Sequence, residues 1–136
     1  NEVARYYAAS EDVAEFLAHY PERHDFREEA GGNRVFINVW CWEPAWKIRV
    51  TENGRELPVR REQTEDPLYV ISYDIPQSVW KGKYPVDYGK RGKQHTLFTV
   101  DASGPATTLE IEVTDSFGKV YRETMTRPKA FGPQMK

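Results

Sequence analysis

The sequence predicts a mainly β fold, an antiparallel, immunoglobulin-like β-sandwich with one short N-terminal helix. Three observations lead to this class. Several short segments alternate apolar and polar residues with the period of a β-strand. Turn residues separate those segments, most clearly at Asn53-Gly54 and at Asp115–Gly118. Helical spacing of apolar residues is clear only near the N-terminus, just before Pro21.

The N-terminal helix is predicted from Ser10 to Tyr20. Ser10 can cap the helix, and the two acidic residues that follow suit the positive end of its dipole. Apolar residues recur at helical spacing on one face. They are Val13, Phe16, Leu17 and Tyr20. Pro21 ends the helix, and the polar stretch 22–32 is expected to be a loop.

The segment from Asn33 to Gly54 contains two predicted strands and three of the four tryptophans. Around residues 35–40 apolar side chains occupy both faces, which is typical of a strand covered on both sides. The second strand has one apolar and one charged face. Its apolar residues are Trp46, Ile48 and Val50, and its charged residues are Lys47 and Arg49. Asn53-Gly54 favours a tight two-residue turn.

Four further strands are predicted at residues 68–73, 96–100, 108–114 and 119–126, the last two joined as a hairpin. The strand 108–114 has the clearest alternation. Its inward residues are Leu109, Ile111 and Val113, and its outward residues are Glu110 and Glu112. The expected organisation is an N-terminal helix and loop over 1–32, a β-sandwich over 33–127 and a C-terminal tail over 128–136.

Length and composition set the broad class of the protein. With 136 residues, 39% hydrophobic and 13% aromatic, the chain is expected to form a globular domain. A net charge of -2 argues against a general nucleic-acid binder. No apolar run is long enough for a membrane span. The chain starts at Asn1 without a methionine, which suggests a piece of a larger protein.

No residue set in the chain predicts catalysis or metal binding. His19 and His24 are not spaced as a helical metal pair. A single cysteine, Cys41, cannot build a zinc cluster, and we expect it to be a buried structural residue. Glycine-rich phosphate loops and the nucleophile elbow are absent. We therefore predict no catalytic residue, no metal ligand and no cofactor in this chain.

The tryptophans and one basic loop are the candidates for contact with a ligand or another domain. Trp40, Trp42 and Trp46 could form an aromatic platform for sugar rings, and Trp40 and Trp42 would share a face if their strand continued through Cys41. A position in the core or at a domain interface is the favoured alternative. In the loop 81–93, basic residues and tyrosines could contact an anionic ligand. The candidate contact residues are Trp42, Trp80, Tyr84, Tyr88, Lys90, Arg91, Lys93 and His95.

Four stretches together resemble a known family. They are VFINVWCWEPAWKIRVTENG from Val35, DPLYVISY from Asp66, HTLFTVDAS from His95, and TLEIEVTDSFGKVYRETMTRPKAF from Thr108. In this order they resemble the C-terminal domain of bacterial calcineurin-like metallophosphoesterases. Cys41 stands where that family usually has Asn.

The resemblance implies a larger secreted, periplasmic or cell-envelope-attached protein. In that family a phosphoesterase domain that binds two metals lies N-terminal to this module. Its metal-binding motifs, of the Asp-x-His, Gly-Asp, Gly-Asn-His and Gly-His-x-His types, are absent from this sequence. The resemblance therefore implies a non-catalytic accessory domain that packs on the catalytic domain of the same polypeptide. The alternative is a β-sandwich module that binds a carbohydrate or another envelope polymer.

Overall fold

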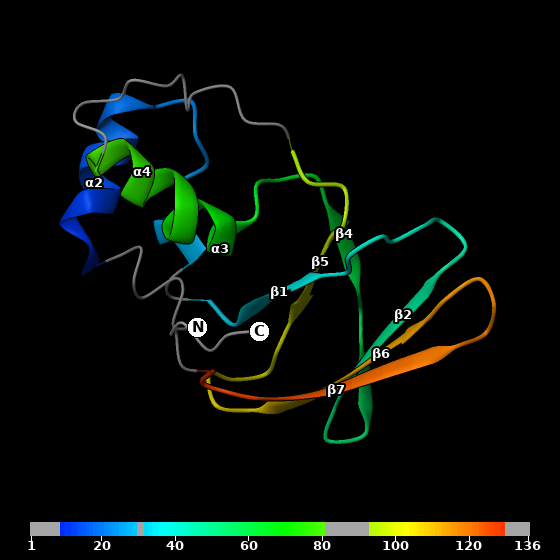
Figure 1. Ribbon diagram of the computed structural model, residues 1–136. Coiled ribbons are helices and arrows are strands. Elements are labelled where there is room, and N and C mark those ends of the chain that lie inside the picture. The colour runs from blue at the N-terminus through cyan, green and yellow to red at the C-terminus, as the bar shows by residue number, and fades with distance from the viewer. Residues whose placement is uncertain (1–8, 30–31, 81–92, 130–136) are drawn as a thin grey trace. The chain divides into compact units, whose positions relative to one another are not determined.

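The computed structural model describes residues 9–29, 32–80 and 93–129 of the chain (Figure 1). Contacts between these residues divide the chain into two compact units, and each unit is built from more than one stretch of sequence. Strands form one unit and helices form the other, so the two are described separately.

The first unit, called here the β unit, takes in residues 32–62 and 96–129. The second, called the helical unit, takes in residues 9–29, 63–80 and 93–95. The chain therefore begins in the helical unit and then builds four strands of the β unit. It returns to the helical unit to form further helix, and finally completes the β unit.

Two antiparallel sheets make up the β unit. The three-stranded sheet has the order β1 (Arg34–Asn38), β5 (Leu97–Asp101) and β4 (Arg60–Glu62). The four-stranded sheet has the order β3 (Arg55–Leu57), β2 (Lys47–Glu52), β6 (Thr108–Thr114) and β7 (Val120–Thr126). The prediction of a mainly β chain with antiparallel sheets is confirmed, and its immunoglobulin-like class stays a prediction.

Both sheets contribute side chains to one hydrophobic core. Val50, Val100 and Leu109 are fully buried in it, and Phe98 and Ile111 are nearly so. The predicted alternation is confirmed in β2, where Lys47 and Arg49 are exposed, and in β6, where Glu110 is exposed between Leu109 and Ile111. Strand periodicity therefore selected the correct inward face in both cases.

Both predicted hairpin turns are present. Asn53 and Gly54 have φ angles of 50° and 76°, which is the left-handed pair that a tight two-residue turn between β2 and β3 requires. In the β6–β7 turn Gly118 has a φ of 83°, and its N–H donates to the carbonyl of Asp115. Each turn fixes the register of the hairpin that it closes.

The predicted N-terminal helix is confirmed as α2 (Glu11–His19) in the helical unit. Ser10 caps it, because its hydroxyl oxygen accepts a hydrogen bond from the N–H of Val13. The expected apolar face is buried through Val13, Phe16 and Leu17. Within the stretch predicted as a loop, a short 3₁₀-helix, η1 (Phe26–Glu29), follows.

The predicted strand at residues 68–73 is wrong, because this stretch is helical. The continuous helical run consists of α3 (Pro67–Tyr69), the π-helical turn η2 (Val70–Asp74) and α4 (Ile75–Trp80). Asp66 caps its start by accepting from the N–H groups of Leu68 and Tyr69, at 2.9 and 3.4 Å. An Asp cap followed by Pro at the first helical position is a helix-start signal that outweighs a short apolar run.

The buried residues of this run recur with helical spacing. They are Pro67, Val70, Ile71, Asp74, Ile75 and Ser78. The π-type hydrogen bond from the Ile75 N–H to the Val70 carbonyl widens the turn just before Pro76. Proline lacks an N–H and collides with the carbonyl four residues earlier in a regular helix. The wider turn relieves that conflict and lets the helix continue to Trp80.

The strand β1 ends at Asn38, so the condition under which Trp40 and Trp42 would share a face is not met. Cys41 has a φ of 58° and an exposed thiol, which corrects the expectation of a buried structural cysteine. A left-handed backbone reverses the chain here, and the Trp42 N–H donates to the Val39 carbonyl. Left-handed positions favour Asn over most residues, which agrees with the Asn that the resembled family places there.

Candidate functional site

Trp42 is packed rather than open. Its ring meets the Phe98 ring edge-on, with centroids 5.3 Å apart and planes at 65°. The guanidinium of Arg61 lies 4.3 Å from the centre of the Trp42 ring. A cation over the ring face is an attractive arrangement, and it occupies a surface that a sugar would need. Trp42 therefore fills the edge of the core of the β unit.

Trp46 also packs against the core, as its alternation with Ile48 and Val50 predicts. Its ring stacks on Tyr121, with centroids 6.5 Å apart and planes inclined by 14°. Lys119 places its ammonium 4.8 Å from the centre of the Tyr121 ring. Trp40, in contrast, is 79% exposed. The three clustered tryptophans therefore do not form one platform, because Trp40 is exposed and Trp42 and Trp46 are packed.

Most of the other candidate contact residues lie outside the described part of the chain. This holds for Tyr84, Tyr88, Lys90 and Arg91. Trp80 is the last residue of α4, and its side chain is not described. Lys93 and His95 are described and exposed. The ligand or inter-domain role expected for these residues, including contact between the loop 81–93 and an anion, stays a prediction.

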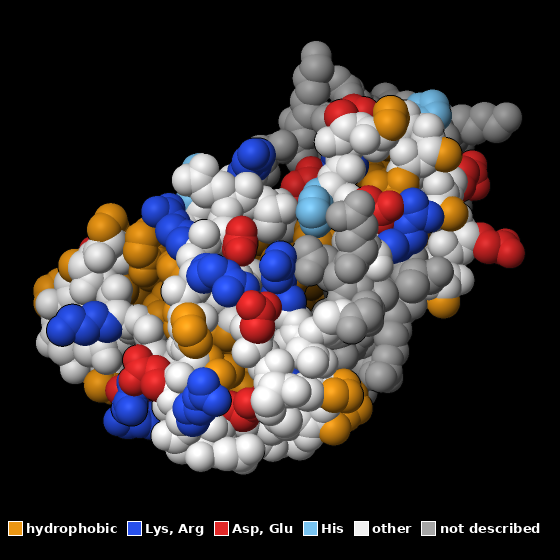
Figure 2. Space-filling view, turned by 180° about the vertical axis from the view of Figure 1, so that it is seen from behind, with side chains coloured by type: hydrophobic (Ala, Val, Ile, Leu, Met, Phe, Trp, Pro, Cys, Tyr) orange, Lys and Arg blue, Asp and Glu red, His pale blue; other side chains and the backbone are white. Residues whose placement is uncertain are grey.

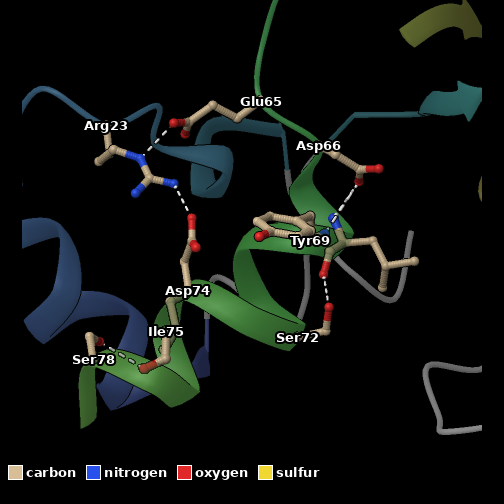
Figure 3. A network of polar contacts seen from close by, with 9 residues as sticks. Arg23, Glu65, Asp66, Tyr69, Ser72, Asp74, Ile75 and Ser78 are labelled. Atoms are coloured by element: carbon tan, nitrogen blue, oxygen red, sulfur yellow. Dashed lines mark hydrogen bonds and ion pairs between the residues drawn. The ribbon is translucent and has the colours of Figure 1, made fainter. Parts of the chain in front are cut away.

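A buried ionic network in the helical unit was not foreseen from the sequence (Figure 3). The Arg23 guanidinium lies 2.6 Å from a carboxylate oxygen of Glu65 and donates to Asp74 over 2.8 Å. The side chains of Arg23 and Asp74 are 2% and 0% exposed. The same guanidinium lies 5.1 Å from the centre of the Phe16 ring. Arg23 thereby joins the stretch 9–29 to the stretch 63–80.

This network connects parts of the fold and is not arranged for chemistry at a surface. Burying a charge is costly unless it is paired, so the three ionic groups depend on one another's positions. Asp74 ends the π-helical turn η2, and the turn directs its carboxylate toward Arg23 (Figure 3). No sequence signal reveals this pairing, because Arg23 and Asp74 are 51 positions apart.

A second buried polar cluster, in the β unit, holds the loop between β5 and β6. Arg127 donates to the carbonyls of Gly104 and Thr107 and to the Thr107 hydroxyl. Glu52, which is 6% exposed, accepts from the Ser103 N–H over 3.1 Å. Hydrogen bonds from Thr107 and Ser103, together with the charge of Arg127, hold the pKa of Glu52 below its ordinary value. Burial lowers the pKa of the Arg127 guanidinium.

The Glu52 carboxylate is expected to make stability depend on acidity. Its pKa is lower in the folded state, so its stabilising contribution is full above the ordinary value of 4.5 and is lost as pH falls through the folded pKa. Glu52→Gln should therefore flatten the loss of unfolding free energy below that pH, measured by urea unfolding at several pH values. Glu56→Gln is the matched control on the same hairpin, because Glu56 is exposed and pairs with Arg49. An unchanged slope for Glu52→Gln would contradict the assignment.

Across residues 9–29, 32–80 and 93–129, no group of three His, Cys, Asp or Glu side chains is placed to hold a metal ion. Among the helices in these ranges, none has the length and apolar character needed to cross a membrane.

Comparison with known proteins gives one match. The model of a family described as the C terminal of calcineurin-like phosphoesterase matches residues 1–121. No curated protein and no solved structure matches the chain significantly. The matched range takes in the whole helical unit and six of the seven strands, and it ends within β7. The family suggested by the four sequence stretches is thus confirmed.

Proposed function

Because this chain belongs to the family of C-terminal domains of calcineurin-like phosphoesterases, we propose that it is a non-catalytic accessory domain. Its role is to pack on the catalytic domain of the same polypeptide and to support it. The observation that carries this proposal is the family match across residues 1–121, which covers most of the chain. The description of the family, the C terminal of calcineurin-like phosphoesterase, supports a catalytic domain in the same polypeptide.

The two described units suit a supporting role. The β unit has a core built from both of its sheets. A well-packed core makes the unit rigid enough for another domain to pack against it. The helical unit is tied internally by the Arg23 network. Neither unit depends on a metal or a disulfide in its described part for these contacts.

The proposal assigns the chemistry to the parent's catalytic domain. That domain would bind two divalent metals, and such ions supply a nucleophile and stabilise charge in phosphate ester hydrolysis. The described residues of this chain do not gather a ligand set for them. We place the parent in the periplasm, outside the cell or at the cell envelope, as the family resemblance implies. With a net charge of -2, nucleic acid is not proposed as a partner.

Binding of a carbohydrate or another envelope polymer is the second candidate function. The observation in its favour is Trp40, which is 79% exposed. A stacking platform uses at least one open ring face, and a pair of coplanar rings improves it. Trp42 is covered by Arg61 and Phe98, and Trp46 is stacked on Tyr121. This arrangement leaves Trp40 as a single exposed indole in the cluster, which makes the glycan function the weaker candidate.

Three proteins test the proposed function: the full-length parent, the parent without this domain, and this chain alone. The chain alone should not hydrolyse an aryl phosphate ester with added manganese or zinc. The truncated parent should unfold at a lower temperature than the full-length protein, because it loses an inter-domain contact of about 600–1,500 Å². Metal-dependent turnover by the purified chain would contradict the non-catalytic assignment. Equal stability and equal kcat/KM of truncated and full-length parent would contradict the supporting role.

A further inference from the structure

One end of the β unit exposes a group of large hydrophobic side chains. Among the described residues, six such side chains are exposed, and four of them lie in two segments at this end. The four are Trp40, Phe117, Val120 and Tyr121. We call this surface, together with Trp46, the aromatic end. In the space-filling view, hydrophobic side chains gather at the left of the β unit, with basic side chains between them (Figure 2).

The two segments of the aromatic end lie side by side. Lys47, the first residue of β2, pairs with Thr114, the last residue of β6. The connection that leads into β2 therefore lies beside the β6–β7 turn, and Figure 1 shows both at one end of the sheet. The stack between Trp46 and Tyr121 joins them directly.

Hydrogen bonds in the β6–β7 turn hold the backbone of Phe117. One carboxylate oxygen of Asp115 accepts from the N–H groups of Phe117 and Lys119, each over 2.9 Å. The other carboxylate oxygen accepts from the Tyr121 hydroxyl over 3.3 Å. Gly118 supplies the left-handed backbone that closes the turn. This turn presents a phenyl ring that is 95% exposed. Because the backbone of the turn is already ordered, its ordering adds little entropic cost to binding.

The segment before β2 is held in the same manner. The Trp42 N–H donates to the Val39 carbonyl, and the Trp46 N–H donates to the Glu43 carbonyl. Both of these tryptophan rings pack against the core. Trp40 lies between the end of β1 and the anchored Trp42, and its ring is exposed. Two fixed segments therefore present two large aromatic rings to solvent.

The charged residues within the two segments, 39–47 and 114–121, balance. Glu43 and Asp115 carry two negative charges, and Lys47 and Lys119 carry two positive charges, so their sum is zero. A surface without a dominant charge does not select an anionic polymer. Aromatic enrichment with few charges at the centre is typical of the core of a protein–protein interface.

We propose that the aromatic end is the surface by which this domain docks on the catalytic domain of the same polypeptide, with Phe117 and Trp40 as the main anchors. The proposal rests on the proposed function, because the family match is what supplies a phosphoesterase domain as the occupant. Large aromatic side chains, Trp and Tyr above all, are among the residues that most often dominate the affinity of an interface. The proposed anchors, Phe117 and Trp40, are not among the contact residues expected from the sequence. Of those expected residues, Trp42 lies in the same segment as Trp40.

The experiment is hydroxyl-radical footprinting of the full-length parent. Trp40 and Phe117 should react several-fold more slowly than in this chain alone. Tyr69 and Tyr73, which are 42% and 47% exposed in the helical unit, serve as the internal reference. Equal reactivity of Trp40 and Phe117 in both proteins would overturn the docking assignment. Protection that increases with protein concentration would overturn it too, because it would assign the surface to a second copy.

A paired variant gives an independent readout. Trp40→Ser with Phe117→Ser in the full-length parent should weaken docking by about tenfold or more, seen as faster proteolysis between the domains. Tyr69→Ser with Tyr73→Ser is the matched control and should leave the proteolysis rate unchanged. If removal of the whole domain lowers parent stability while the paired variant has no effect, the proposed function stands and this surface is wrong. If removal of the domain also has no effect, both proposals fail.

Discussion

Replacing Arg23 by Met is expected to lower the free energy of unfolding by about 3–5 kcal/mol. The guanidinium contacts both Glu65 and Asp74, and its side chain is 2% exposed. Without it, two carboxylates lose their cation in a place where water cannot solvate them fully. Breaking a buried ion pair from one side is costly because the remaining charge is left uncompensated. Urea unfolding followed by far-ultraviolet circular dichroism measures the change, because the helical unit contributes the helical signal.

Arg27→Met is the matched control for this prediction. Arg27 lies four residues further along the same stretch and pairs with Asp25, but its side chain is 42% exposed. Surface ion pairs contribute little because water and salt already screen them. The control should therefore unfold at nearly the same urea concentration as the unchanged protein. Similar losses from Arg23→Met and Arg27→Met would mean that the buried network does not hold the helical unit together.

Leu109→Ala is expected to lower the free energy of unfolding by about 2–5 kcal/mol. Leu109 is fully buried in β6, in the core that both sheets share. Its truncation removes apolar contacts and leaves a cavity that the packed sheets can fill only in part. Its neighbour Glu110 points outward and is exposed, with one carboxylate oxygen accepting from the Thr124 hydroxyl.

Glu110→Ala is the control and should cost about 0.5 kcal/mol or less. The two positions are adjacent on one strand, so they share backbone, sheet and hairpin and differ chiefly in the face that they occupy. Thermal unfolding of the two variants in parallel gives the comparison. A loss from Glu110→Ala as large as that from Leu109→Ala would show that the register of β6 is wrong.

Local patterns predicted five of the seven strands of the β unit, whereas β3 and β4, of three residues each, had no predicted range. Alternation with period two identified β2 and β6, and β7 was identified as the hairpin partner of β6. The turns at Asn53-Gly54 and at Asp115–Gly118 fixed their limits. These signals depend only on residues close together in sequence. The turns and strand faces that they specify are present in the structure. The same is true of α2, where a cap, an amphipathic face and a proline agree.

The errors occurred where a local pattern was ambiguous or where the decisive contact was distant. Residues 68–73 form a short apolar run, and such runs do not distinguish a strand from a buried helix. The Asp66 cap and Pro67 favoured the helix, and the spacing from Val70 to Ser78 supports it. The chain reversal at Cys41 has no signal in its residue type, since cysteine gives no preference for a left-handed backbone.

The candidate site was predicted less well than the fold. Tryptophan clustering in the sequence suggested one aromatic surface, but burial depends on which rings meet Phe98, Arg61 and Tyr121. These partners come from three other strands or their ends. Phe117 was treated only as part of a turn, although an aromatic side chain at a tight turn has no place in the local core. That position was the available signal for an exposed anchor.

The interleaved connectivity of the two units has a consequence for the order of folding. Arg23 can pair with Asp74 only after 51 further positions have been synthesised. Arg60 of β4 can pair with Asp101 only after 41 further positions. During synthesis the first half of each unit emerges before the second half of either. Folding slows as contacting residues lie farther apart along the chain. Both units therefore close late in synthesis, and no single cut in the chain separates one intact unit from the other.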